Sequence, residues 1–148
     1  MPIKCNTDMS KLFAKIDTAT DAARENFQEA FQKTCLEITN LAKSTNTYKD
    51  QTNNLRSSIG FIVYDKGELV NEMFTKSGIG IEGDGSKGIN QGKQIAEQAA
   101  EKFPNALVGV IVAGMEYALK VEAKGYDVLT GSCIQAKTIL EKNLKLTE

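Results

Sequence analysis

Apolar residues recur at three- and four-residue steps between residues 10 and 43, and charged and amide side chains fill most of the positions between them. This spacing predicts one long amphipathic helix, and neither proline nor glycine interrupts it. At 1.5 Å per residue the helix would be roughly 50 Å long, which is more than one small sheet can cover. Two readings stay open: the helix packs wholly on its own domain, or part of its stripe awaits a partner. The stripe consists of Leu12, Ile16, Ala19, Ala23, Phe27, Ala30, Phe31, Cys35, Ile38 and Leu41.

A coiled-coil dimer is the weaker alternative for this helix, since the spacing over the whole run does not hold a strict heptad.

Two runs of strand character follow a polar linker at residues 44–54. Residues 59–64 and 69–75 flank Asp65, Lys66 and Gly67, which predicts a β-hairpin with a short turn. Apolar residues alternate in the first run, so we expect one face to bury against the long helix and the other to be only partly polar.

The remaining chain predicts a loop, a strand and several helices. Residues 78–92 contain six of the chain's twelve glycines, which predicts a flexible loop. A helix is expected over about residues 90–103, ending at Pro104, with Ile95, Ala96, Ala99 and Phe103 facing inward. Residues 106–112 are almost continuously apolar, which favours a central strand. Shorter elements follow: a helix at 117–124, an extended piece at 126–129 and a helix at about 132–144.

These elements predict a single α+β domain over residues 1–148. We expect a small, mainly antiparallel sheet of three to four strands, packed by the long N-terminal helix and a C-terminal helix. A chain of 148 residues with 41% hydrophobic residues can bury enough apolar surface to fold without disulfide bonds or structural metal sites.

Composition limits the kinds of partner and the cellular location that we expect for this chain. No apolar run approaches the roughly 20 residues of a membrane span, so we expect a soluble protein with no membrane partner. The start lacks the charged and apolar regions of a secretory signal, which predicts cytoplasmic synthesis. A net charge of −1 argues against specific nucleic-acid binding.

The chemistry available to the chain is limited. It has no histidine, the commonest metal ligand and the commonest general base near neutral pH, and this excludes a Cys or Ser nucleophile paired with histidine. Cys5, Cys35 and Cys133 form no CxxC pair. Cys35 falls on the apolar stripe and reads as a small buried hydrophobe, while Cys5 and Cys133 read as free thiols in a reducing compartment. We therefore expect no enzymatic activity and no metal.

The glycine-rich segment also offers no convincing cofactor site. Gly78, Gly80 and Gly83 match G-x-G-x-x-G, but further residues intervene before the predicted helix, whereas a dinucleotide fingerprint opens directly into one. A calcium loop fails because Lys87 and Lys93 occupy the positions of its glycine and bidentate glutamate. We expect a mobile loop that orders on contact with a neighbour.

Two short motifs carry the most functional information. Residues 52–59 read TNNLRSSI, a polar turn that leads through Leu55 and Arg56 into the first strand. Residues 117–125 read YALKVEAKG, with Tyr117 and Glu122 in a short helix that ends at a glycine.

Together the motifs resemble those of the tail-completion, or minor tail-component, family of long-tailed bacteriophages, which reads roughly D-T-G-x-L-R-x-S-I and Y-A-x-x-V-E-x-G. This chain departs from the pattern in three places. Asn53 replaces the glycine, Gln51 separates Asp50 from Thr52, and two residues rather than one lie between Glu122 and Gly125.

The resemblance implies a structural virion protein of the phage neck. It implies a homo-oligomeric ring of six copies at the head–tail junction, made in the host cytoplasm, between a head-side adaptor or stopper protein and the tail tube or tail terminator protein. Arg56 and Glu122 would pair with each other or across a subunit boundary, or they simply belong to a loop entry and a surface helix. The hypothetical interface residues are Thr52, Asn54, Leu55, Arg56, Gly83, Asp84, Tyr117 and Glu122.

Two other functions remain open. The first is a small bacterial α+β binding or regulatory module whose glycine-rich loop closes on a small acidic ligand. The second, a hydrolase with an unusual carboxylate pair, is weaker, because no recognised motif supports it.

Overall fold

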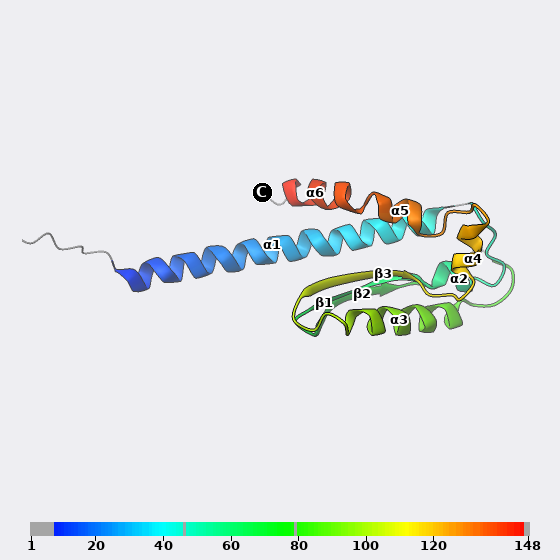
Figure 1. Cartoon of the computed structure of the whole chain (residues 1–148), viewed down its shortest axis with the longest axis horizontal. Coiled ribbons are helices and arrows are strands. Elements are labelled where there is room, and N and C mark those ends of the chain that lie inside the picture. Colours follow the sequence, from blue (N-terminus) through cyan, green and yellow to red (C-terminus); the bar gives the residue numbers. More distant parts are fainter. Residues whose placement is uncertain (1–7, 46, 79, 147–148) are drawn as a thin grey trace, which may run out of the picture.

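The computed structural model describes residues 8–45, 47–78 and 80–146, and it has the predicted α+β fold. A long N-terminal helix, a three-stranded sheet and several shorter helices follow one another (Figure 1). The hairpin and the long helix lie where the sequence predicts them. The elements are α1 (Met9–Ser44), α2 (Asn54–Ser57), β1 (Ile59–Asp65), β2 (Glu68–Phe74), α3 (Ser86–Ala100), β3 (Leu107–Ala113), α4 (Ala118–Ala123), α5 (Thr130–Ile134) and α6 (Ala136–Leu146).

The sheet is antiparallel throughout, with strand order β2-β1-β3. Lys66 and Gly67 both have positive φ at the hairpin turn, the geometry that matches the twist of two paired strands. The prediction of a central strand at residues 106–112 is wrong, because β3 is an edge strand and β1 is central. Helical layers shield the faces of β3, so its lack of a polar face does not require a central position.

Helices cover both faces of the sheet (Figure 1). On one face Phe61 and Val63 of β1 pack with Cys35 of α1, as the alternation predicts. On the other face Ile62 packs with Ala96 of α3. The second face, expected to be only partly polar, is covered by α3.

Helix α3 begins earlier than expected and turns small residues inward. It starts at Ser86, so Gly88 and Gly92 belong to the helix rather than to a flexible loop. A Cβ atom on Gly92 would lie 2.6 Å from the Ser58 carbonyl oxygen and 2.7 Å from the Phe74 ring. Small residues thus face the sheet, whereas Ile95 is 44% exposed and Phe103, beyond the helix end, is 55% exposed, although both are predicted to face inward.

The C-terminal region packs on α1 instead of on the sheet, contrary to the prediction. Two helices, α5 and α6, replace the single helix expected at 132–144, and the 126–129 segment forms no strand. In α6 the Asn143 amide donates a buried hydrogen bond of 3.1 Å to the Thr34 hydroxyl of α1. Lys142 forms a 3.1 Å ion pair with Glu37. The layers are therefore α5 and α6, α1, the sheet and α3 (Figure 1).

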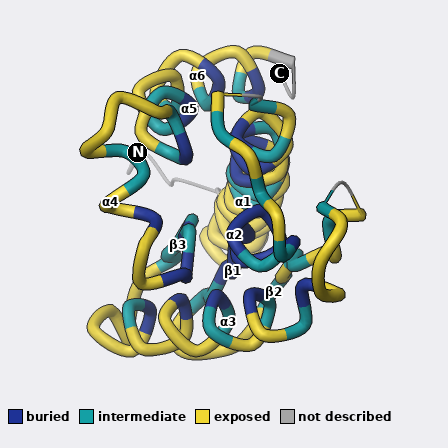
Figure 2. The backbone as a smooth tube through the Cα atoms, turned by 90° about the vertical axis from the view of Figure 1, so that its right-hand side faces the viewer, coloured by how far each residue is buried: buried dark blue, intermediate teal, exposed yellow. Residues whose placement is uncertain are grey.

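Helix α1 has two unlike halves. Its C-terminal half lies between α6 and the sheet and contributes the buried residues of the helix. Residues 9–27 are all exposed and extend past the rest of the domain (Figures 1 and 2). An ion pair of 2.7 Å between Arg24 and Asp65 lies near the boundary between the halves. The domain thus leaves the N-terminal half of the stripe uncovered.

Candidate functional site

The fold brings the two motifs together at the end of the domain opposite the free half of α1 (Figure 1). Thr52 and Leu55 from the first motif and Tyr117 from the second line one pocket of 360 Å³, which we call the motif pocket. Burial raises the pKa of the Tyr117 phenol, and a hydrogen bond with the Thr52 side chain opposes that shift. The remaining lining residues are Tyr48, Lys49, Asp50, Gln51, Asn54, Lys87, Met115 and Val121.

Arg56 is buried next to this pocket, against the ring of Tyr48, one of its lining residues. Its side chain is only 4% exposed, and its Nη1 donates a 2.8 Å hydrogen bond to the Lys43 carbonyl at the end of α1. The guanidinium carbon lies 5.1 Å from the centre of the Tyr48 ring, a cation–π arrangement. Its backbone N–H donates to the Asp50 carboxylate at 2.7 Å. Arg56 therefore joins the first motif to α1 and lies beneath the surface.

Asn53 holds the glycine-rich loop onto the first motif. It has φ +62°, and its side-chain amide donates to the carbonyls of Gly80 at 3.1 Å and Gly83 at 2.9 Å. Its Oδ1 accepts from the Gly80 N–H. The backbone N–H of Glu82 also donates to the Gln51 carbonyl, at 2.8 Å. The described part of the loop is thus bonded within the chain, with no neighbouring subunit needed; residue 79 lies outside the described residues.

Gly83 and Asp84 lie on the loop rather than in the motif pocket. The Asp84 carboxylate accepts hydrogen bonds from the Ser86 N–H at 3.0 Å and the Ser86 hydroxyl at 2.6 Å, and it pairs with Lys76 at 3.0 Å. The bonds from Ser86, followed by Lys76, hold the pKa of Asp84 well below its usual range. These contacts define the start of α3.

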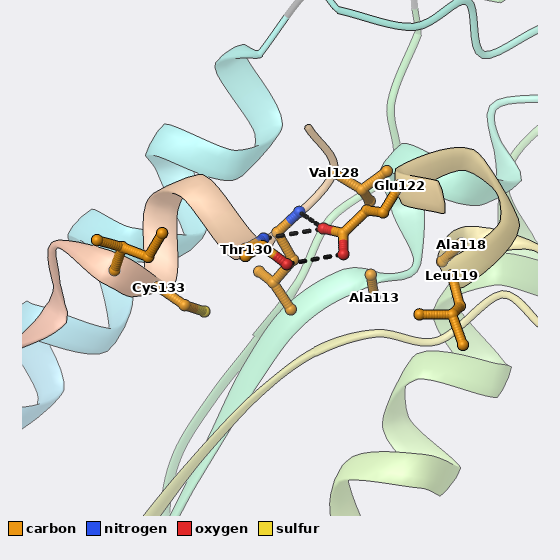
Figure 3. Close-up of a pocket in the computed structure, with 9 residues that line it drawn as sticks. Ala113, Ala118, Leu119, Glu122, Val128, Thr130 and Cys133 are labelled. Carbon is orange, nitrogen blue, oxygen red and sulfur yellow. Dashed lines mark hydrogen bonds between the residues drawn. The ribbon is translucent and has the colours of Figure 1, made fainter. Parts of the chain in front are cut away.

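Glu122 faces away from the motif pocket and binds the start of α5. Its carboxylate accepts from the N–H groups of Leu129 at 2.8 Å and Thr130 at 2.9 Å, and from the Thr130 hydroxyl at 2.7 Å (Figure 3). Burial raises the pKa of Glu122, but these hydrogen bonds outweigh it, so the pKa lies below its ordinary value. Pairing of Arg56 with Glu122 is therefore wrong, because each has other partners within the chain.

An apolar groove of 490 Å³ lies beside Glu122, and sequence reasoning missed it (Figure 3). We call it the α4–α5 groove. Leu119 is 76% exposed and Ile134 is 77% exposed, although both are large apolar residues. The remaining lining residues are Ala113, Ala118, Glu122, Val128, Leu129, Thr130 and Cys133.

Sequence reasoning also missed that Asn53 holds the loop, because the sequence shows only its tolerance of positive φ and not its hydrogen bonds. Asparagine tolerates positive φ, which is a local property. Its bonds to Gly80 and Gly83 join segments far apart in the chain, and no local pattern reports them.

Cys35 is buried as predicted, and burial raises the pKa of its thiol to about 11. Cys133 is a free thiol at the groove, whereas Cys5 lies outside the described residues.

Comparisons with family models, with curated proteins and with solved structures find no match to this chain. Among the described residues no helix is long and apolar enough to cross a membrane. In the same part of the chain no three His, Cys, Asp or Glu side chains gather in a cluster that could hold a metal ion.

Proposed function

We propose that this chain is a structural component of a tailed-phage virion, a neck or tail-completion protein that forms a ring between the head connector and the tail. In this proposal six copies assemble into the ring, the head side meets an adaptor or stopper protein, and the tail side meets the tail tube or tail terminator protein. The chain acts through complementary surfaces and catalyses no reaction.

The convergence of the two motifs carries the proposal. Thr52 and Leu55 share the motif pocket with Tyr117, although three strands and helix α3 separate them in the sequence. Arg56 is buried against the ring of Tyr48, which lines the same pocket, and bonds to the end of α1. Part of each motif thus builds one feature of the fold, while Glu122 of the second motif binds the start of α5 instead.

The free half of α1 supports an assembling role. An amphipathic helix normally buries its apolar face against its own domain, yet Met9, Phe13 and Ile16 are each half or more exposed. Exposed apolar surface of this extent is typical of surfaces that bind other proteins. A channel through the ring would pass the genome without base contacts, in keeping with a net charge of −1.

Electron microscopy with an antibody against this chain tests the proposal. The sample is a lysate of host cells in which the phage that encodes the chain is multiplying, imaged before and after purification of intact virions. We expect label at the head–tail junction. Absence of label from every virion, with the protein free in the host cytoplasm, would refute the neck function.

The alternative function, a small-ligand binding module, is favoured by one observation. The motif pocket has a volume within the range of about 300–1,000 Å³ that is common for small-molecule sites. A thermal-unfolding screen against small carboxylic acids tests it: a ligand that raises the midpoint supports a binding module. Closure of the glycine-rich loop over such a ligand has less support, because the side chain of Asn53 already bonds that loop to the first motif.

A further inference from the structure

The two edge strands of the sheet differ in what protects them from pairing with another chain. Strand β2 carries Glu68 and Glu72, and its register with β1 shifts between Val63 and Tyr64, as at a β-bulge. Charges and bulges of this kind keep an edge strand from acting as a template for further strands. Strand β3, at the other margin of the sheet, reads LVGVIVA and pairs with β1 without a register shift (Figure 2). The free edge of β3 therefore lacks the protection that β2 has.

The hydrogen bonds beside β3 show which of its backbone groups point away from the sheet. The Gly114 N–H donates to the Ser58 carbonyl at 3.2 Å, and the Lys66 N–H donates to the Ala106 carbonyl at 3.1 Å. Hydrogen-bonded and non-bonded pairs alternate along an antiparallel ladder, so the even-numbered residues of β3 bond to β1. The odd-numbered residues direct their N–H and C=O groups outward, and none of these groups bonds to another described residue. They are Leu107, Gly109, Ile111 and Ala113.

We propose that β3 pairs with β3 of a second copy of this chain, antiparallel, about a two-fold axis at Val110. In this register Leu107 pairs with Ala113 of the second copy, and Gly109 pairs with Ile111. Each of these pairs exchanges two backbone hydrogen bonds, so every outward N–H and C=O group of β3 finds a partner. The two sheets become one continuous antiparallel sheet.

The side chains of β3 suit this pairing. Across the contact Val110 meets its own copy, Val108 lies opposite Val112, and Ile111 lies opposite Gly109. All of these residues are apolar, so no like charges oppose each other, and β-branched cross-strand pairs stabilise a sheet. Every residue of β3 except Val112 is only half-buried in the single chain, so the contact covers apolar surface.

A second copy of β3 is the partner that matches this edge in length, apolar character and position of the outward groups. Pairing with β2 of another copy is less suitable, because it brings Glu68 and Glu72 against a strand without charges. Pairing of β2 with itself sets these carboxylates of two copies near each other, which is destabilising. The sequence of β3 therefore favours β3 as its own partner.

This inference goes beyond the proposed function. A two-fold contact stops at a dimer of equivalent halves, whereas the proposed ring has unlike head and tail sides. The dimer is thus a form of the free chain and not the repeating contact of the ring. Label at the head–tail junction with no dimer in solution would remove the contact and leave the function, and a dimer with no label on any virion would do the reverse.

An exchange of charge at Val110, followed by sedimentation velocity, tests the contact. We expect the unaltered chain to form dimers as its concentration rises. Val110→Lys and Val110→Glu should each stay monomeric, because the two-fold axis sets like charges against each other. An equimolar mixture of the two should form a heterodimer, because opposite charges then meet. Leu69→Lys and Leu69→Glu, at an exposed residue of β2, are the controls and should dimerise like the unaltered chain.

Ala113→Pro tests the same edge without a charge. The Ala113 N–H points outward, so proline removes no hydrogen bond to β1, but it removes one to the second copy and inserts its ring between the strands. We expect the dissociation constant of the dimer to rise at least about tenfold, because the bond is lost in both directions. Circular dichroism of every variant separates loss of the contact from loss of the fold.

Amide hydrogen exchange measures the edge directly in the unaltered chain. Exchange of the Gly109 and Ile111 N–H groups should slow as the protein concentration rises, because these groups become hydrogen-bonded in the dimer. The Glu72 N–H, which points outward on the opposite edge, is the control and should exchange at a constant rate.

Three results would overturn the contact. The first is an unaltered chain that remains monomeric even at about millimolar concentration. The second is self-association of both Val110 variants as strong as that of the unaltered chain, which would indicate a contact through the free half of α1 or the α4–α5 groove. The third is a mixture of the two folded Val110 variants that stays monomeric while the unaltered chain dimerises.

Discussion

At the scale of single residues, the first motif depends on side chains that do two things at once. Asn53 adopts positive φ and also bonds Gly80 and Gly83, so one residue shapes the turn and holds the loop. Arg56 is buried with no carboxylate ion pair among the described residues, and it relies on the Lys43 carbonyl and the Tyr48 ring. Both residues are buried, and both join segments of the chain rather than form part of an exposed surface.

Asn53 can be tested by separating its backbone and side-chain contributions. Asn53→Ala loses the hydrogen bonds to the loop, and alanine is also strained at positive φ. We therefore expect the free energy of unfolding to fall by about 2–4 kcal/mol. Asn53→Gly loses the same bonds but accepts the backbone conformation, and its loss should be smaller by about 1 kcal/mol. Urea unfolding measures both. Equal losses for the two variants would mean that the backbone conformation contributes nothing.

Glu122 predicts a pH dependence. Its pKa is lower in the folded state than in the unfolded chain, so its contribution to stability is full above the unfolded pKa and is lost as the pH falls through the folded pKa. At neutral pH Glu122→Gln should lower the free energy of unfolding by about 0.5–1.5 kcal/mol, because the charged acceptor is lost.

Urea unfolding of both proteins between neutral pH and the acid range checks this behaviour. The difference between the two should shrink as the pH falls through the folded pKa, and a constant difference would contradict the proposed cause. Unchanged assembly and stability of Glu122→Gln would also remove Glu122 from any subunit interface.

At the scale of elements, close packing explains why α3 departs from its predicted form. Gly88, Gly92 and Ala96 form the side that meets α2 and the sheet, and the absence of bulk lets the backbones approach. Sequence reasoning treated the glycines as flexibility, because glycine disfavours helices and a pattern of small residues carries little hydrophobic signal. Tertiary contact outweighs that local preference.

Gly92→Ala tests this explanation. Alanine favours a helix by about 1 kcal/mol over glycine, but its Cβ would meet the Ser58 carbonyl oxygen and the Phe74 ring. We expect the clash to dominate and the free energy of unfolding to fall by about 1–3 kcal/mol. Asn90→Ala, at an exposed position of the same helix, is the control and should be neutral or slightly stabilising. Stabilisation by Gly92→Ala, measured by urea unfolding, would show that α3 can move away.

At the scale of the whole molecule, the two halves of α1 contribute unequally to the fold. The C-terminal half contributes Cys35, Ile38 and Ala42 to the core, whereas residues 9–27 contribute no buried side chain. A helix that leaves its domain gains little stability from packing and depends on propensity and caps. The free half of α1 therefore remains available for the assembling role proposed above.

Deletion of residues 1–21 tests this difference between the halves. The deletion spares Arg24 and its ion pair with Asp65. We expect the free energy of unfolding to change by less than about 1 kcal/mol, because the described residues that are removed, 8–21, are all exposed. Dimerisation should persist, as measured by sedimentation velocity, because the deletion leaves β3 intact. A large drop in stability would mean that the free half of α1 supports the fold.

Local patterns in the sequence were enough to predict the long helix, the hairpin, the burial of Cys35 and the α+β class. Each of these depends on the periodicity of neighbouring residues, which is present in the chain before it folds. The same patterns could not rank β1 and β3 as centre and edge, nor place α6 on α1, because strand order and layer order depend on which apolar faces meet. The α4–α5 groove and the hold of Asn53 on the loop likewise exist only after segments distant in the sequence come together. Tertiary structure alone also decided that half of the α1 stripe is left uncovered, since the sheet and α6 reach only so far along it.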